Sequence, residues 1–563
     1  MKAYLPLFLL GLGLSLTVKA QQNYPQDYFR NPLDIPILLA GNFGECRPNH
    51  FHTGLDLKTN EKENLKVYAA ADGYVSRISI SWSGYGNALY ITHPNGYTTL
   101  YGHLNDFYPE LQRYLRQQQY ERESWNGDLY LQPGQFPVKK GQLIAYSGTT
   151  GGSTGPHLHF EIRDTRTEHV LNAALFGLPI KDGKAPVPKS VALYSSGSIY
   201  EQQPVLYPLL KNGDDYMLPG ITATDAQVRL GVLADDFMEG SPNPLGVYSM
   251  KLYLDDALQA SWVLDDINFD ENRYVNAFAD YRLKEDKKGW YQTLFRIPGN
   301  HIANYTFLND ADGALDLSDG QPHALHIELR DAAGNTTHIR GHITGGKAKP
   351  AMTCKSWKAG QPYELKTNTL SFKAGADALY DDICFRYSEQ ASPKSYSSVV
   401  QLQETRIPLH SNTKLSVRLN RMLPFSLSGK LVFIHRIKAA ALPGNNPQDA
   451  AAASFEQGWA KADVRTFGNY VVGIDTVAPL IVPLPKGTVL TRAKQIRFRV
   501  TDNMTSVQQF RAELDGRWLC FVRAGNVYTY TFDEHCPPGK HNLVITAGDE
   551  NNNSRKYTFT FTR

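Results

Sequence analysis

Short apolar segments separated by turn residues recur along almost the whole chain, and they restrict the fold to a mainly β architecture. Residues 87–104, NALYITHPNGYTTLYGHL, consist of two runs rich in β-branched and aromatic residues on either side of Pro-Asn-Gly. Such a sequence is typical of two antiparallel strands joined by a tight turn. Residues 65–81 repeat the pattern around Asp-Gly. One exception is a mostly polar segment rich in helix formers at 108–124, which predicts a helix in a surface insertion.

The length of 563 residues exceeds what one hydrophobic core supports, so several domains are expected. Two Pro-rich segments, at 180–190 and 475–487, have the composition of linkers. Together with the change in sequence texture they predict the following division: a signal peptide at 1–20, a first domain at 21–185 with an insertion at about 108–133, a β-sandwich domain at 186–345, a β-rich domain at 346–475 and an immunoglobulin-like sandwich at 476–563.

Two segments of the C-terminal part resemble each other. Residues 328–343 and 546–561 each contain a strand, an aspartate, an Asn-containing turn and a second strand. This similarity predicts related immunoglobulin-like β-sandwiches, because short strands with regular turn signals are typical of that architecture. Residues 346–475 are less regular. They include an Ala-rich stretch at 446–462, NPQDAAAASFEQGWAKA, for which we predict a short helix.

The N-terminus predicts export. Lys2 precedes an apolar stretch at 4–18, and Val18-Lys19-Ala20 has the form of a signal cleavage site. No cysteine follows for lipid attachment, and no later segment resembles a transmembrane helix. The formal net charge is only +3, without a long basic block, so nucleic acid is not expected as a partner. The expected location is the periplasm, with secretion as the alternative.

The chain contains five cysteines, and none has the C-x-x-C spacing of a thiolate zinc site. In an exported protein they can form disulfides. We expect Cys354 to pair with Cys384 and Cys520 with Cys536, because each pair lies within one predicted domain. Cys46 would then remain free.

Histidines are concentrated in the first 170 residues, where seven of the sixteen lie. In STGPHLHFEIRD, residues 153–164, His157 and His159 share one face of a predicted strand with Glu161 and Arg163. One interpretation is the ordinary polar face of a half-buried strand. The other is a metal or catalytic site built on that strand.

A second pattern favours the metal site. His52 and Asp56 lie on the same side of an extended segment, separated by the small residue Gly54. An imidazole and a carboxylate suit zinc, and a third ligand from the His-x-His strand completes a set of three that leaves one coordination position open for catalysis. The second histidine of that strand, and His103, could then contact the reactants instead.

Three segments resemble, in order, the signature motifs of the lysostaphin/LytM-type zinc metallopeptidases, which cleave peptidoglycan: GNFGECRPNHFHTGLDLKT (41–59), GYTTLYGHL (96–104) and VKKGQLIAYSGTTGGSTGPHLHFEIRD (138–164). The resemblance covers about residues 37–165 and implies the antiparallel β fold called the duplicated hybrid motif. It also implies that His52, Asp56 and His159 bind Zn²⁺, and that His103 and His157 are the catalytic imidazoles.

The resemblance therefore predicts an exported zinc metalloendopeptidase that hydrolyses the peptide crosslinks of bacterial peptidoglycan. Two alternatives remain: a secreted enzyme that attacks foreign cell walls or Gly-rich proteins, and a scaffold that regulates other wall hydrolases. The C-terminal β domains would offer surfaces for protein or glycan partners. Glu161 is expected either to orient a ligand or to be an ordinary polar strand residue, and His93 is expected to be structural.

Overall fold

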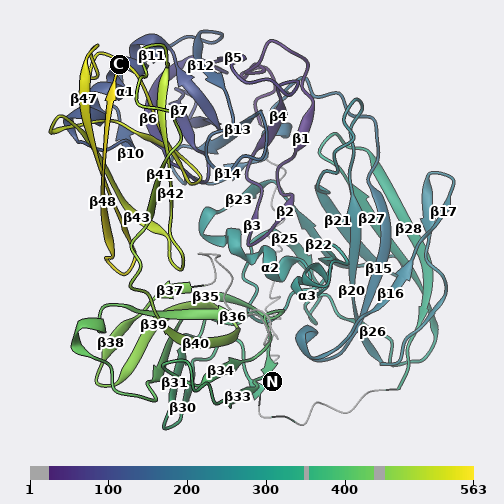
Figure 1. Ribbon diagram of the computed structural model, residues 1–563. Coiled ribbons are helices and arrows are strands. Elements are labelled where there is room, and N and C mark those ends of the chain that lie inside the picture. The colour runs from purple at the N-terminus through teal and green to yellow at the C-terminus, as the bar shows by residue number, and fades with distance from the viewer. Residues whose placement is uncertain (1–23, 348–353, 355, 437–449) are drawn as a thin grey trace, which may run out of the picture.

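The computed structural model describes residues 24–347, 354, 356–436 and 450–563 (Figure 1). The expected signal peptide at 1–20 lies outside these residues. The prediction of a mainly β protein is confirmed, since the described chain consists mostly of antiparallel strands. None of the helices in the described part has the length and apolarity needed to cross a bilayer.

The strands form four successive groups, here called units 1 to 4, and we propose that they correspond to the four expected domains. Unit 1 contains the main sheet that carries the histidines. Its strands follow the order β1 (Leu39–Gly41), β4 (Leu55–Lys58), β13 (His157–Asp164), β8 (Tyr97–Gly102), β7 (Asn87–Thr92), β6 (Gly73–Ile80) and β10 (Gly127–Tyr130). A smaller sheet consists of β5 (Lys66–Tyr68), β12 (Leu143–Ser147) and β9 (Leu104–Phe107).

Strand β13 lies between β4 and β8 and is buried on both faces. Leu158, Phe160 and Ile162 point into the core, as the alternation predicts. The polar face is also buried, with His159 only 3% exposed and Glu161 fully inaccessible. Buried polar and charged groups require hydrogen-bond or ion-pair partners. This face is therefore a polar cluster inside the protein and not a solvated strand surface.

Units 2 to 4 each contain two larger sheets. Unit 2 includes β15 (Val187–Ser195) and β20 (Gln227–Asp235) in one sheet, and β27 (Pro322–Arg330) and β28 (Thr336–Thr344) in the other. Unit 3 includes β35 (Pro408–Arg418) and β39 (Trp459–Thr466), opposite β36 (Leu431–Arg436) and β40 (Gly468–Ile474). Unit 4 includes β41 (Leu480–Pro483) and β42 (Gln495–Thr501), opposite β43 (Val507–Leu514), β47 (Lys540–Asp549) and β48 (Ser554–Thr562).

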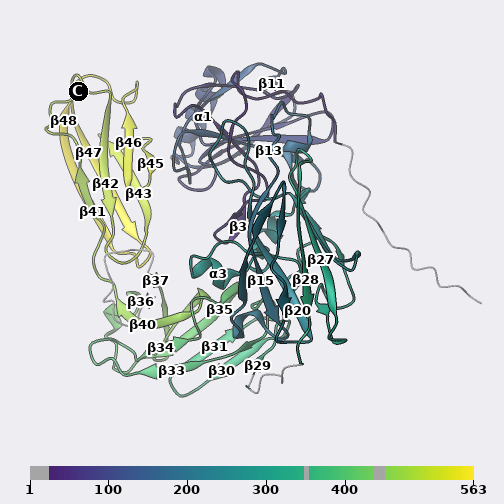
Figure 2. The ribbon, with the colours of Figure 1, turned by 90° about the vertical axis from the view of Figure 1, so that its right-hand side faces the viewer.

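The predicted insertion helix is present as α1 (Pro109–Glu121), and it connects unit 1 to unit 4. The ring of Tyr120 stacks on that of His535 with centroids 3.6 Å apart, and Glu123 forms a 2.7 Å ion pair with Arg511. The last unit of the chain therefore contacts the first. In Figure 1 the yellow C-terminal strands lie beside the purple-blue unit 1. Figure 2 shows the same arrangement from the side, with unit 3 below and unit 4 rising from it.

One prediction of local secondary structure is wrong. The Ala-rich stretch is not a helix in its described part, because β37 (Ala450–Ala452) pairs with β36 and β38 (Ser454–Glu456) pairs with β39. The left-handed turn residue Gly458 separates the last two strands, and sheet pairing overrides the helix propensity of alanine. Residues 446–449 lie outside the described part.

The cysteines follow the prediction in part. Cys354 and Cys384 form the expected disulfide, and Cys46 is free and buried. Cys520 and Cys536 are also free, so their predicted pairing is wrong. The thiol of Cys520 faces α1, where Arg116 donates to its Sγ at 3.0 Å, whereas Cys536 packs inside the unit 4 core.

Candidate active site

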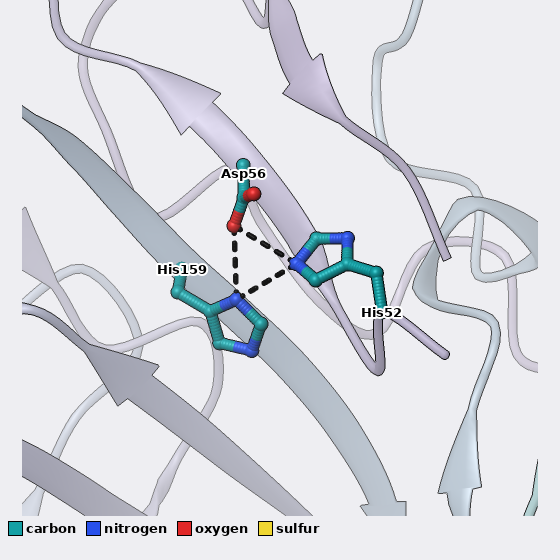
Figure 3. Close-up of side chains that lie close together, drawn as sticks. All are labelled: His52, Asp56 and His159. Atoms are coloured by element: carbon teal, nitrogen blue, oxygen red, sulfur yellow. Dashed lines mark hydrogen bonds and ion pairs between the residues drawn. The ribbon is translucent and has the colours of Figure 1, made fainter. Parts of the chain in front are cut away.

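Three side chains from two adjacent strands and the loop before them converge on one point (Figure 3). His52 Nε2 lies 3.0 Å from Asp56 Oδ1 and 3.1 Å from His159 Nδ1, and His159 Nδ1 lies 2.9 Å from Asp56 Oδ1. The register of β4 and β13 places Asp56 directly opposite His159. A Cβ at Gly54 would lie 2.7 Å from the His159 ring, so only glycine permits this approach.

In the rings of His52 and His159, the nitrogen that points away from the cluster fixes the tautomer. Nδ1 of His52 lies 2.7 Å from the carbonyl of Asn42, which can only accept, so this nitrogen carries the proton. Nε2 of His159 donates to the Glu161 carboxylate at 2.9 Å. In its neutral form each ring would therefore direct a lone pair at the common point, as a metal ligand requires.

The donor set fits zinc. Zinc lies about 2.0–2.1 Å from imidazole nitrogen, which separates two tetrahedral donors by roughly 3.3 Å. The three observed separations of 2.9–3.1 Å are close to that value. Two imidazoles and one carboxylate also match the ligand types that zinc prefers, and three donors leave one position open.

The charges of the site are unusual for a protein interior. Burial works to raise the pKa of Asp56, yet His52, His157 and His159 hold it well below its usual range. Arg47 donates to the second oxygen of Asp56 at 2.7 Å. Burial opposes protonation of His159, but hydrogen bonds with Asp56 and Glu161 outweigh it and raise its pKa to about 9. At neutral pH the imidazole of His159 is therefore protonated in the metal-free protein, and its positive charge faces the carboxylates of Asp56 and Glu161.

Glu161 orients His159 and is itself fixed. Its Oε1 accepts hydrogen bonds from Thr53 at 2.6 Å and from Tyr85 at 2.7 Å, in addition to His159. Its Oε2 accepts from Arg163 Nε at 2.8 Å. Of the two interpretations of Glu161, the geometry favours the orienting role.

His103 and His157 lie beside the cluster, with ring centroids 4.6 Å apart. Nδ1 of His103 donates to the carbonyl of Thr150 at 2.8 Å, and Nδ1 of His157 donates to that of Gly155 at 2.9 Å. Nε2 of each neutral ring is therefore left with its lone pair. Nε2 of His157 lies 3.4 Å from Asp56 Oδ1, to which it donates when the ring is protonated. Burial, reinforced by the His159 and His157 imidazoles, lowers the pKa of His103 to about 3.

The two remaining histidines near the motifs have different surroundings. His93 is buried between the carbonyl of Asp72 and the hydroxyl of Thr99, which is a structural arrangement. His50 is exposed and lines the cleft described next.

The cluster opens into a cleft of about 700 Å³ that is formed by three units. Unit 1 contributes His52, His103 and His159. The opposite side comes from the short helix η3 (Phe269–Tyr274) of unit 2, including Arg273, and from Arg465 of unit 3. Both guanidinium groups donate to backbone carbonyls, those of Leu409 and His410, and within the described residues neither has a carboxylate at ion-pair distance. No sequence motif indicated these two arginines.

Comparisons with known proteins agree with the geometry of unit 1. Residues 50–120 and 125–171 match the model of peptidase family M23, and residues 355–475 match that of the Zu5-like domain. The DD-carboxypeptidase/endopeptidase Mpg of Neisseria meningitidis serogroup B is 36% identical over 112 residues, which are 20% of each chain. The peptidoglycan DD-endopeptidase ShyC of Vibrio cholerae is 38% identical over 140 residues, 24% of this chain and 26% of the relative.

Among solved structures, a zinc-containing peptidase from Vibrio cholerae is 28% identical, covering 25% of this chain and 36% of that one, with a TM-score of 0.18. The chain thus spans about a fifth to a quarter of the length of its curated relatives. Unit 1 contains a domain of a metallopeptidase family. Its residues 50–171 are a domain of peptidase family M23.

Proposed function

We propose that the chain is an exported zinc metalloendopeptidase that hydrolyses peptide crosslinks of bacterial peptidoglycan. One observation carries the proposal: His52, Asp56 and His159 direct three ligand atoms at one point inside a family M23 domain. Relatives that share this domain are named as peptidoglycan DD-endopeptidases.

In the proposed mechanism, His52, Asp56 and His159 hold the zinc ion, and Glu161 keeps His159 oriented. When bound, zinc supplies a Lewis acid that activates water and polarises the scissile carbonyl. His103 and His157 each have Nδ1–H held by a carbonyl, so each has Nε2 free to accept a proton or a hydrogen bond at the reacting atoms. One accepts the proton of the attacking water and returns it to the leaving amine, while the other stabilises the developing oxyanion in its protonated form.

The cleft supports an anionic peptide substrate. Arg273 and Arg465 present two guanidinium groups without carboxylate partners in the described structure, on the side opposite the histidines. Burial, with a smaller contribution from the charge of Arg465, lowers the pKa of Arg273. Stem peptides of peptidoglycan carry free carboxylates, which such a pair binds through charge-assisted hydrogen bonds.

Export is supported by the disulfide between Cys354 and Cys384, because disulfides persist in oxidising compartments. The relatives named as peptidoglycan endopeptidases act on a substrate outside the cytoplasm, which agrees with the signal-like N-terminus.

The test is digestion of isolated peptidoglycan sacculi by the purified, zinc-loaded full chain, followed by separation of the released muropeptides. Uncrosslinked muropeptides should accumulate, and a chelator or the substitution His157→Ala should abolish them. The matched control is His93→Gln, which changes a histidine of the same unit outside the cluster. If zinc-loaded protein releases nothing while its thermal unfolding is normal, the scaffold interpretation replaces the enzyme. If it cleaves Gly-rich peptides but not sacculi, the substrate assignment is wrong.

A further inference from the structure

The two similar C-terminal hairpins contain the same turn. In unit 2, Asp331 accepts hydrogen bonds from the backbone of Asn335 at 2.8 Å and from its side-chain amide at 2.7 Å. In unit 4, Asp549 accepts the same two bonds from Asn553, at 2.8 and 2.7 Å. The turn therefore holds an aspartate rigidly at the same corner of each unit.

In both units this aspartate meets two others that are distant in sequence. One comes from the linker that precedes the unit, and one from the region where an inner strand ends. Within each group of three, one carboxylate oxygen per residue lies within 4.8 Å of the others: Asp182, Asp236 and Asp331 in unit 2, and Asp475, Asp502 and Asp549 in unit 4. The same arrangement thus occurs twice in the chain, independently of the histidine site.

These carboxylates lack counter-charges. Asp236 is 3% exposed, and its Oδ1 has no hydrogen-bond partner among the described residues. Asp502 is half-buried, and its Oδ2 atom is inaccessible and has no hydrogen-bond partner in the described structure. No lysine or arginine of the described chain lies at ion-pair distance from either cluster. The ammonium group of Lys184, two residues after Asp182, donates to the carbonyl of Met238. In each group two of the three acids are buried and the third is half-buried, and carboxylates that face one another in this way without a cation are costly unless something positive binds them.

Burial and mutual repulsion raise the pKa values of two aspartates in the unit 2 group. Burial, with repulsion from Asp331 and Asp182, raises the pKa of Asp236 to about 8. Burial, opposed in part by the backbone amide of Lys184, raises the pKa of Asp182 to about 6. A bound divalent cation would remove this repulsion.

We propose that each cluster binds one calcium ion through its three aspartates. Carboxylate oxygens, with neither histidine nor cysteine in either group, are hard ligands that suit calcium and not zinc. Calcium also accepts the irregular geometry of backbone and side-chain oxygens at a loop, whereas magnesium demands a nearly ideal octahedron.

The position of the ligands gives these ions a mechanical role. Asp182 belongs to the segment that connects unit 1 to β15, and Asp475 to the segment that connects unit 3 to β41. The side chains of Asn335 and Asn553 also donate to the backbone carbonyls of these two linker aspartates, at 3.2 and 3.1 Å. Each ion therefore fastens a linker to the hairpin of the unit that follows, which fixes how that unit is oriented on its predecessor.

The experiment measures calcium bound by the zinc-loaded full chain in equilibrium dialysis. With the affinities of extracellular calcium modules, dissociation constants of about 0.1–1 mM, two ions per chain are expected at about 5 mM calcium. Asp236→Asn and Asp502→Asn should each remove one ion, and the double variant both. Asp214→Asn, an exposed aspartate outside both clusters, is the matched control and should retain two.

Thermal unfolding separates binding from a purely structural role. Calcium should raise the melting temperature of the wild type by on the order of 5 °C. The substitution Asp236→Asn removes one of the repelling charges, so this variant should be folded without calcium. Its melting temperature should rise less than that of the wild type when calcium is added. The proposal is overturned if the wild type binds no calcium at this concentration, if both single variants still bind two ions, or if magnesium at equal concentration produces the same binding and shift.

Discussion

Replacing Glu161 by glutamine tests the physical basis of the proposed zinc site without changing a predicted ligand. Glu161 is fully buried and accepts from Thr53, Tyr85 and Arg163 while it orients His159. Glutamine keeps the shape but removes the charge and turns one acceptor into a donor. The ring of His159 then loses the partner that fixes its protonated nitrogen and increases the basicity of the other.

The expected magnitudes follow from these contacts. Loss of an orienting partner lowers metal affinity by about 10–100-fold. The change also leaves the guanidinium of Arg163 with only a distant, exposed carboxylate, that of Glu168 at 3.6 Å. Breaking a buried ion pair costs about 3–5 kcal/mol, so the free energy of unfolding should decrease by a comparable amount. Because the neighbouring Arg163 and His159 lower the pKa of Glu161, this stability is present at neutral pH and is lost as pH falls through the lowered value.

The assay is competition for zinc with a chromophoric chelator, together with thermal unfolding of the zinc-loaded protein. Glu168→Gln makes the same chemical change on the exposed partner of Arg163 and should leave zinc affinity within about twofold. If Glu161→Gln is folded and binds zinc as tightly as the wild type, the hydrogen bond to His159 does not tune the metal site, and the reasoning is refuted.

Four further predictions concern the site. His159→Ala should lose zinc and activity together, whereas His157→Ala should keep zinc at full stoichiometry and lose activity; zinc retained in His159→Ala would contradict the ligand set. Because zinc must displace a proton from His159, whose pKa is about 9 in the metal-free protein, zinc affinity should rise about tenfold per pH unit between pH 7 and 8.5, measured by chelator competition. The same group stabilises the metal-free fold below its ordinary pKa of 6.5, and that contribution should disappear as pH rises through 9. Arg465→Ala should raise KM for an acidic crosslink peptide about 10-fold at unchanged kcat, and no change in KM would exclude the cleft arginines from binding.

Local sequence patterns were sufficient where the chemistry is local. The period-two alternation in 157–164 predicts which residues share a face, and the spacing of His52 and Asp56 predicts a side chain pair without an obstruction between them; the structure brings both to His159 within 3.1 Å. The assignment of zinc ligands itself stays a prediction. Sequence patterns failed where a distant partner determines the local structure. The Ala-rich stretch forms strands because it pairs with β36 and β39, and Cys520 is not in a disulfide but faces α1, about 400 residues earlier in the chain.

The cleft shows why sequence motifs could not describe the substrate side of the site. Its far wall exists because η3 packs on β3 (His50–Phe51): the backbone amide of Phe51 donates to Asn272, and the ring of Phe51 packs against Phe278. Arg465 reaches the same cleft from unit 3, more than 400 residues after His52. Neither arginine lies in a motif, because each is placed by packing between units and not by its own segment. In the proposed function, the predicted metal ligands define the reaction and the contacts between units define which peptide can reach it. A variant that loosens a unit junction should therefore change KM more than kcat.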